Sequence, residues 1–491
     1  MGIIIKQSIK GSIWSYLGVG IGFITTAYLY PNYLSTDTVG LLGLLLAWSI
    51  LLAQFSSLGF NGVIARLFPY FRNKEKGHNG FLFISFVVMA VGFVFFLVFY
   101  FLFSPWLVAK NAEKSQLFSQ YVYLLIPLTF FTLLYNFLDG FNRVLYNAVL
   151  GTFLVEFLQR LLILVLVLLF VFNFFSLHQL VLAYVAAVSV KGIILFLYLW
   201  ARGEANLKPQ LKFVDKKLRN EMVSVAFYFI LTGLGGSIVF SIDKIIVNQM
   251  LGLSATGVYT IAFFFGTLVI IPSRPLLRIS GTLIADAWKR NDVPYIADIY
   301  KRSCLNQFII GAFLFGGIWV NIDSILIILG PEYAQGKWVI FLIALGYLVD
   351  MATGANGLVI AYSKYYRMSL WFLIVLIFTV LISMYFLIPL WGIVGAAAAI
   401  ALSFLLNNVM HFVFLYYKYK MQPFNAKFLV ILGALGVAYF TGNLLNQLQL
   451  IPDILIRSSI FSIIFGGVIL LFRVSDDVNG ILKKIFFNGK L

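Results

Sequence analysis

Charged residues are scarce in this chain. They make up 11% of its 491 residues, while hydrophobic residues make up 62% and the mean hydropathy is +0.98. Soluble domains carry roughly 25% charged residues, so this chain cannot cover a water-facing surface with charge. The scarcity excludes an ordinary soluble protein and predicts a membrane protein.

Cysteine and histidine are scarce as well. The single cysteine, Cys304, excludes a disulfide framework and a cysteine-based metal site. The three histidines, His78, His178 and His411, lack metal-ligand spacing, and no Walker sequence for ATP hydrolysis is present. We therefore expect no metal site, no cofactor and no ATP hydrolysis by the protein itself. We also expect no enzymatic activity, because the longest outer loop, about fourteen residues near Ser104–Leu117, leaves little room for an active site.

Between clusters of charge, the chain has apolar runs of about 20 residues or more, each long enough to cross about 30 Å of hydrocarbon as a helix. The run Met368–Tyr417 is too long for one helix, and the Pro–Gly turn signal in Ile388–Gly392 divides it. The sequence thus predicts an all-α polytopic membrane protein with about fourteen transmembrane helices. We expect spans near residues 12–31, 38–60, 80–103, 118–138, 148–171, 179–200, 222–247, 255–273, 303–328, 337–362, 368–388, 392–416, 427–446 and 455–472.

The 35 Lys and Arg residues fall on alternate loops. If the N-terminus is inside, 28 lie in inner segments, four lie in outer loops, and Arg160, Lys191 and Lys244 lie within spans. This bias predicts an even number of spans, with both termini in the cytoplasm. It also explains the net charge of +17 without a nucleic-acid partner. Residues 1–14 show no signal-peptide cleavage pattern, and the basic tail Ile481–Leu491 is expected to lie on the inner leaflet.

An internal repeat predicts two related halves. LSTDTVGLLG (Leu34–Gly43) resembles LGLSATGVYT (Leu251–Thr260), and YFRNKE (Tyr70–Glu75) lies over AWKRND (Ala287–Asp292) at the same offset of 217 residues. Six spans separate the copies, so the halves share one orientation. We expect two pseudo-symmetric six-helix lobes around a central cavity, plus two additional C-terminal helices. The expected domains are an N-terminal lobe (1–203), a cytoplasmic linker (204–221), a C-terminal lobe (222–417), and two spans with a basic tail (418–491).

Charges inside spans are candidate site residues, because a charge at mid-bilayer is costly unless it faces a partner or water. Glu156 and Arg160 are four residues apart, so they share a helix face and can pair. They either line a cavity or form a structural ion pair. Lys191 is too deep in its span for its side chain to reach the interface, which favours a cavity-facing position.

Three further charges have more than one interpretation. Asp243 and Lys244 lie near the outer end of a span, where Lys244 could also extend to the headgroups. Asp350 precedes the Gly-rich run Met351–Gly357, which is suited to a kink. It is a candidate coupling-ion site or a hydrogen-bonding partner between helices. Asp139 and Arg143 lie at an inner span end, where charges are ordinary.

Two segments carry a family resemblance. SIVFSIDKIIVNQMLGLSATGVYTIA (Ser237–Ala262) resembles the Asp-basic-apolar-Leu-Gly signature of polysaccharide flippases. WGIVGAAAAIALSFLLNNVMHFVFLYYKYK (Trp391–Lys420) is similar to their C-terminal region, with a Gly-x-x-Gly-Ala turn and a span that ends in a basic aromatic run. The resemblance covers the whole chain. The family that the chain resembles is the oligosaccharide-flippase branch of the multidrug/oligosaccharidyl-lipid/polysaccharide exporter (MOP) superfamily.

The resemblance implies a transporter that moves an undecaprenyl-diphosphate-linked oligosaccharide from the inner to the outer leaflet by alternating access. The cargo would serve synthesis of O-antigen, capsule or exopolysaccharide in a bacterial plasma (inner) membrane. Arg160, Lys191, Glu156, Lys244 and Asp243 would then line the substrate cavity. Partners would be the lipid-linked oligosaccharide, membrane lipids, and glycan polymerases or glycosyltransferases. A lipid II flippase, a multidrug or cation antiporter, and more distantly a polysaccharide polymerase or ligase are the alternatives.

Overall fold

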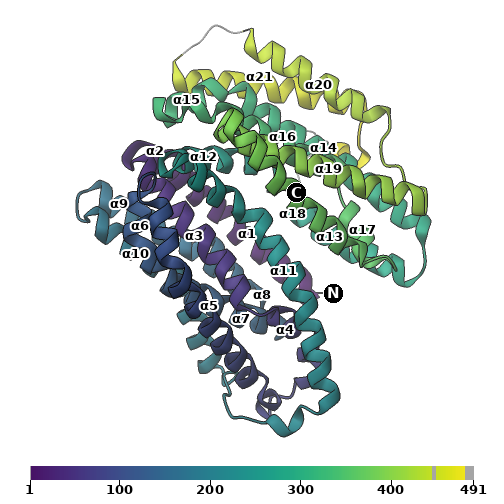
Figure 1. Cartoon of the computed structure of the whole chain (residues 1–491). Coiled ribbons are helices and arrows are strands. Elements are labelled where there is room, and N and C mark those ends of the chain that lie inside the picture. Colours follow the sequence, from purple (N-terminus) through teal and green to yellow (C-terminus); the bar gives the residue numbers. More distant parts are fainter. Residues whose placement is uncertain (1, 445–448, 481–491) are drawn as a thin grey trace. The chain divides into compact units, whose positions relative to one another are not determined.

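The computed structural model describes residues 2–444 and 449–480, and all regular elements in these two ranges are helices (Figure 1). The chain forms two compact units, Met1–Thr260 and Ile261–Leu491. The expected basic tail Ile481–Leu491 lies outside the described residues. The expected division at residues 204–221 remains a prediction.

The first unit contains the helices from α1 to α11 and the start of α12, which continues into the second unit. Their bounds are α1 (Gly2–Phe23), η1 (Ile24–Leu29), α2 (Tyr30–Tyr33), α3 (Thr36–Ser56), α4 (Phe60–Phe71), η2 (Gly77–Gly80), α5 (Phe81–Asn111), α6 (Gln116–Tyr121), η3 (Val122–Leu124), α7 (Leu125–Val144), α8 (Ala148–Thr152), η4 (Phe153–Leu158), α9 (Gln159–Val171), α10 (Leu177–Ala201), η5 (Leu211–Phe213), α11 (Lys216–Leu251) and α12 (Leu253–Thr267).

The second unit contains the remaining helices. They are η6 (Leu268–Ile270), α13 (Ser273–Lys289), α14 (Val293–Val320), α15 (Ile322–Leu329), η7 (Pro331–Gly336), α16 (Lys337–Thr353), α17 (Asn356–Tyr362), α18 (Met368–Trp391), α19 (Ile393–Tyr419), α20 (Ala426–Asn443) and α21 (Leu450–Leu471). In Figure 1, α20 and α21 (yellow) lie side by side, and they pack on each other and on α14.

Fourteen helical stretches of the described residues are long and apolar enough to cross a membrane. This confirms the expected all-α polytopic fold and the count of spans. The division of the long apolar run is confirmed too, because α18 ends at Trp391 and α19 begins at Ile393. Several boundaries were predicted wrongly. The ninth span is Val293–Val320 and not 303–328, the third ends at Asn111 and not 103, and the tenth ends not at 362 but at Thr353, where Gly354 has a positive φ of 56°.

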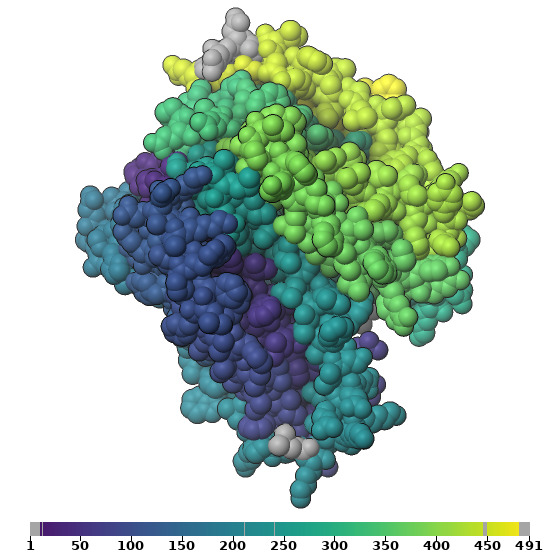
Figure 2. All heavy atoms as spheres, viewed as in Figure 1, coloured from purple at the N-terminus to yellow at the C-terminus, as the bar shows by residue number. Residues whose placement is uncertain are grey.

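Apolar side chains cover the outside of several helices. On α18 these include Trp371, Phe378 and Phe386, and on α5 they include Phe101 and Leu102, all of them exposed. Figure 2 shows part of this surface, with the α18–α19 segment in light green. Apolar surface of this extent is typical of helices that face lipid tails, which agrees with membrane-spanning helices.

The repeat-equivalent segments at the starts of α3 and α12 meet within the first unit. A Cβ added to Gly257 would lie 1.9 Å from the carbonyl oxygen of Thr36, and a Cβ added to Gly40 would lie 2.2 Å from that of Leu253. Thr36 and Leu253 are repeat counterparts, as are Gly40 and Gly257, so the contact is reciprocal, as about a local two-fold axis. The hydroxyls of Thr36 and Ser254 are 2.7 Å apart. We call this contact the glycine seam.

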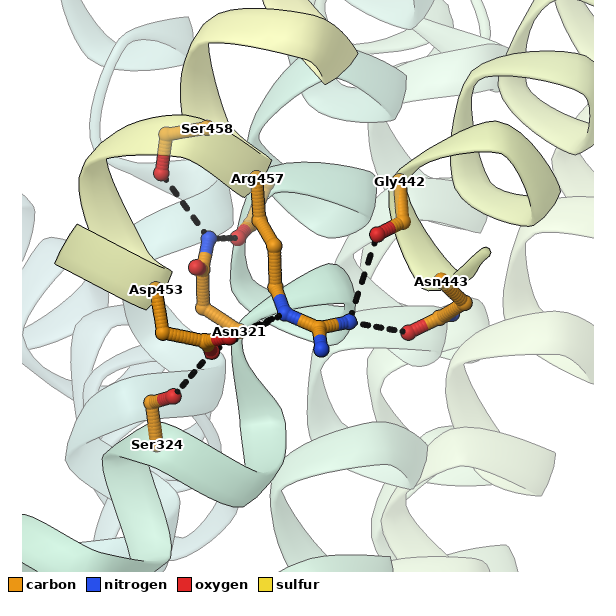
Figure 3. A network of polar contacts seen from close by, with 8 residues as sticks. Asn321, Ser324, Gly442, Asn443, Asp453, Arg457 and Ser458 are labelled. Carbon is orange, nitrogen blue, oxygen red and sulfur yellow. Dashed lines mark hydrogen bonds and ion pairs between the residues drawn. The ribbon is translucent and has the colours of Figure 1, made fainter. Parts of the chain in front are cut away.

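A buried polar network joins the start of α21 to neighbouring helices of the second unit (Figure 3). Arg457 Nε donates to both carboxylate oxygens of Asp453 at 2.9 Å, and its Nη1 donates to the carbonyl of Gly442 and the side chain of Asn443. Ser324 Oγ donates to Asp453 at 2.8 Å. The ion-pair side chains are only 4% and 11% exposed, so this pair is sealed from solvent.

Removing one partner of this sealed pair should be costly. We expect Arg457→Met to destabilise the unit by about 3–5 kcal/mol, because it leaves the Asp453 carboxylate buried without its counter-ion. The double variant Arg457→Met with Asp453→Leu should recover most of the loss. Thermal unfolding in detergent would measure both variants. Equal destabilisation by the two would show that packing, and not charge pairing, holds α21.

A polar contact fixes the segment that follows α10 to the loop before α5. Glu204 pairs with Lys74 Nζ at 2.8 Å, and the buried ring of His78 lies 2.8 Å from the other carboxylate oxygen. Gln210 Nε2 donates to the carbonyl of Lys76 at 2.9 Å. Residues 204–210 are therefore held by the first unit before α11 begins.

This contact should weaken in acid. Burial alone would raise the pKa of Glu204, but hydrogen bonds from Lys74 and His78 outweigh it and hold this pKa below its ordinary value of 4.5. Because the folded-state pKa is lowered, the contribution to stability is complete above pH 4.5 and is lost as the pH falls through the lowered pKa. We expect pepsin to cleave residues 202–215 more slowly in the wild type than in Glu204→Gln above pH 4.5. This difference should disappear as the pH falls through the lowered pKa of Glu204, because only the wild type has a carboxylate there to lose. Glu75→Gln, which changes an exposed carboxylate on the same loop, is the control and should behave like the wild type.

Candidate functional site

The candidate site lies inside the first unit, where α10 packs on α7 and α9. Glu156 is on η4, a π-helical turn, and Arg160 follows on α9. Lys191 projects from α10 and Tyr135 from α7. Together with Gln159, these residues form what we call the polar tract. π-Helical turns occur frequently at functional sites, since the extra residue per turn re-aims the side chains that follow.

The ion pair expected from the spacing is present. Arg160 Nη2 donates to Glu156 Oε2 at 2.7 Å, and the side chains are 30% and 20% exposed. Arg160 Nη1 donates to the backbone carbonyl of Gly18 on α1 at 3.0 Å. Gly18 also allows α1 to approach η4 closely, because a Cβ there would lie 1.7 Å from the carbonyl oxygen of Glu156.

Lys191 is buried, and no carboxylate among the described residues forms an ion pair with it. Its ammonium donates to Gln159 Oε1 at 2.8 Å and lies 5.1 Å from the centre of the Tyr135 ring. An amide oxygen and a ring face stabilise a cation without neutralising it. The tract therefore contains a buried positive charge that a partner anion could neutralise.

Sequence reasoning missed the residues that connect the tract. Gln159 lies between Glu156 and Arg160 in the chain, and its polarity within an apolar run was a visible signal. Tyr135 gave none, since aromatic residues are common in this sequence. Asp139, interpreted as an ordinary charge at a span end, is buried. One of its carboxylate oxygens pairs with Arg143 at 2.6 Å, and the other has no hydrogen-bond partner among the described residues.

The other predicted site residues lie elsewhere. Asp243 is buried on α11 and accepts a hydrogen bond from Tyr259 at 3.0 Å, while the neighbouring Lys244 is half-buried. Asp350, on α16 in the second unit, accepts a hydrogen bond from Asn408 of α19 at 3.0 Å. Asn408 also accepts from Thr353 and Asn356, so Asp350 belongs to a cluster of amides and hydroxyls.

An apolar groove lies between α14 and α21 of the second unit. It encloses about 650 Å³ and is lined by Ile309, Phe313, Phe465, Gly466 and Gly467, among others. Added Cβ atoms at the two glycines would meet no atom within 4 Å. The groove is wide and hydrocarbon-like along its length.

Fourteen candidate spans identify a polytopic membrane protein, and charges within such spans are typical of transporters. The comparisons with known proteins agree. The chain belongs to the family described as "Polysaccharide biosynthesis protein", whose family model matches residues 7–278. This confirms the resemblance to the polysaccharide-flippase branch of the MOP superfamily.

Individual relatives are distant. The chain is 23% identical over 212 residues to the "Probable low-salt glycan biosynthesis flippase Agl15" of Haloferax volcanii, and this match covers 43% of the chain and 45% of that relative. Among solved structures, it resembles "Lipid II flippase MurJ, inward closed conformation" with a TM-score of 0.73 and 13% identity, over 96% of this chain and 100% of that one. A multidrug resistance MATE family transporter in an inward-facing conformation gives 0.60 and 15%, over 83% and 94%. Similarities this low in identity show a common fold.

Proposed function

We propose that the protein moves an undecaprenyl-diphosphate-linked oligosaccharide from the inner to the outer leaflet by alternating access, for the synthesis of a surface polysaccharide. The observation that carries this proposal is the buried Lys191, which has an amide and a ring as partners but no carboxylate in the part of the chain that the structure describes. A buried cation of this kind is costly in an apolar interior, and a diphosphate guest would neutralise it. A cationic cargo would be repelled.

The family is an argument for a glycan in the cargo, and the apolar groove is an argument for a hydrocarbon chain attached to it. The relative from Haloferax volcanii is named as a probable flippase of glycan biosynthesis. The apolar groove between α14 and α21 offers a place for part of a polyprenyl chain while the sugars remain in water. Asp243 and Lys244 are further cavity residues in this proposal, and Asp350 is a coupling-ion site.

The proposed orientation places both termini in the cytoplasm of a plasma membrane, because positively charged residues concentrate in the loops on that side. Glycosyltransferases that build the lipid-linked oligosaccharide and a polymerase that consumes it are the proposed partners. Reporter fusions at each terminus would test the orientation, and an active outer-side reporter at either end would contradict it.

A reconstituted transport assay tests the cargo. The full chain is placed in liposomes with a fluorescent undecaprenyl-diphosphate oligosaccharide, and exposure of the label to a membrane-impermeant quencher reports flipping. We expect flipping well above protein-free vesicles and no uptake of a monocationic dye. Parallel vesicles that contain lipid II in place of the oligosaccharide lipid test the alternative that the protein is a lipid II flippase. Transport of the dye alone would overturn the proposal in favour of a cation antiporter.

A further inference from the structure

Two i,i+4 ion pairs within apolar helices differ in how they are enclosed. Asp453–Arg457 has side chains that are 4% and 11% exposed, and Ser324, Asn443 and Gly442 complete its hydrogen bonds (Figure 3). Glu156–Arg160 has side chains that are 20% and 30% exposed. The first pair is sealed, whereas the second is partly exposed at the surface of its helices.

Arg160 has an anchor that does not depend on Glu156. Its Nη1 donates to the Gly18 carbonyl at 3.0 Å, and a Cβ added to Gly22 would lie 2.8 Å from the same nitrogen. Its Nη2 donates to Glu156 at 2.7 Å. The guanidinium can therefore keep its position on α1 while the partner of Nη2 is exchanged.

Phosphate and carboxylate compete for the same face of a guanidinium, since both are acceptors of charge-assisted hydrogen bonds with matching geometry. From these contacts we infer that Glu156 occupies, on Arg160, the place that a cargo phosphate takes during transport, and that its return releases the cargo. The inference rests on the proposed function and deepens it. Glu156 is then a residue that sets affinity and release, and not a fixed structural partner.

The surroundings of Glu156 suit such an exchange. It lies in the middle of the π-helical turn η4, a rare alternative to the α-helix that is frequent at functional sites. Gln159 of the following turn holds Lys191, the second cation of the tract, at 2.8 Å. A diphosphate that displaced Glu156 from Arg160 would thus find a second cation close to the same stretch of chain.

Removing the competing charge tests the inference. We expect Glu156→Gln, in the purified full chain, to bind inorganic pyrophosphate about tenfold more tightly than the wild type, since the amide competes weakly for Arg160. In the flipping assay the same variant should have a lower KM and a lower kcat, because release is slowed. Asp286→Asn is the matched control, since Asp286 and Arg290 form an exposed i,i+4 pair, and it should change neither quantity.

A structural ion pair would behave differently. Glu156→Gln would then lower the melting temperature and leave pyrophosphate affinity unchanged or weaker, and this result would overturn the inference. If Glu156→Gln does not fold, Glu156→Asp replaces it. Because its shorter carboxylate reaches Arg160 less well, this variant should bind pyrophosphate more tightly than the wild type does. Equal or weaker binding by this variant overturns the inference. A wild type that neither binds pyrophosphate nor flips the lipid overturns the proposed function itself.

Discussion

Neutralising the two deep cations of the polar tract should abolish transport. We expect Lys191→Met to reduce flipping of the diphosphate lipid by about tenfold or more, and the double variant with Arg160→Gln by on the order of 100-fold, because a charge contact to the bound anion is lost at each position. The reconstituted flipping assay measures both. Lys110→Met, which changes an exposed lysine at the end of α5, is the matched control and should retain full transport.

The variant Lys191→Met also separates an effect on transport from an effect on folding. Lys191 is buried with an amide and a ring as partners, so replacing it with an apolar side chain of similar length removes a desolvation cost. Lys191→Met should therefore melt at the wild-type temperature or above it while transport falls. Full flipping by a well-folded double variant would contradict the proposed role of both cations.

Locking the glycine seam should also stop transport. Alternating access requires the segments that close one side of a transporter to separate, and the seam joins repeat-equivalent segments that the proposed orientation puts at outer loops. The Thr36 and Ser254 hydroxyls are 2.7 Å apart, so Thr36→Cys with Ser254→Cys places two thiols close enough to form a disulfide. With Cys304→Ala as background, we expect oxidation to reduce flipping by at least about tenfold, and a reductant to restore it.

The crosslink has its own controls. Each single cysteine variant should transport normally in both oxidised and reduced states, and mass spectrometry would establish that the disulfide has formed. A crosslinked protein that still flips lipid at the wild-type rate would show that the seam does not separate during transport. Gly257→Leu is an independent probe, since a side chain there would collide with the Thr36 carbonyl and keep the seam open.

The fold was largely predictable from the sequence, and the reason is physical. A helix must be about 20 apolar residues long to cross a bilayer, so each span leaves a mark that does not depend on its neighbours. The turn at Ile388–Gly392 was predictable because its proline and glycine form a local turn signal. The start of the ninth span was not, because the first part of α14 carries Asp298, Lys301 and Arg302, and hydropathy does not distinguish a charged helical stretch from a loop.

The candidate site was only partly predictable. Glu156 and Arg160 pair because a helix brings positions four apart onto one face, which is a property of the sequence alone. The partners of Lys191 come from α9 and α7, which are 32 and 56 positions away along the chain. No local pattern encodes a contact of that kind.

By itself, the sequence determined that this protein is a helical membrane protein of fourteen spans with a duplicated pattern and a few deep charges. Only the tertiary structure decided that the Asp453–Arg457 pair is sealed while the Glu156–Arg160 pair is accessible, and that Lys191 has no carboxylate partner among the described residues. The reason is that hydropathy and helical spacing act within a single helix. The burial and pairing of a charge are set by which other helices pack against it.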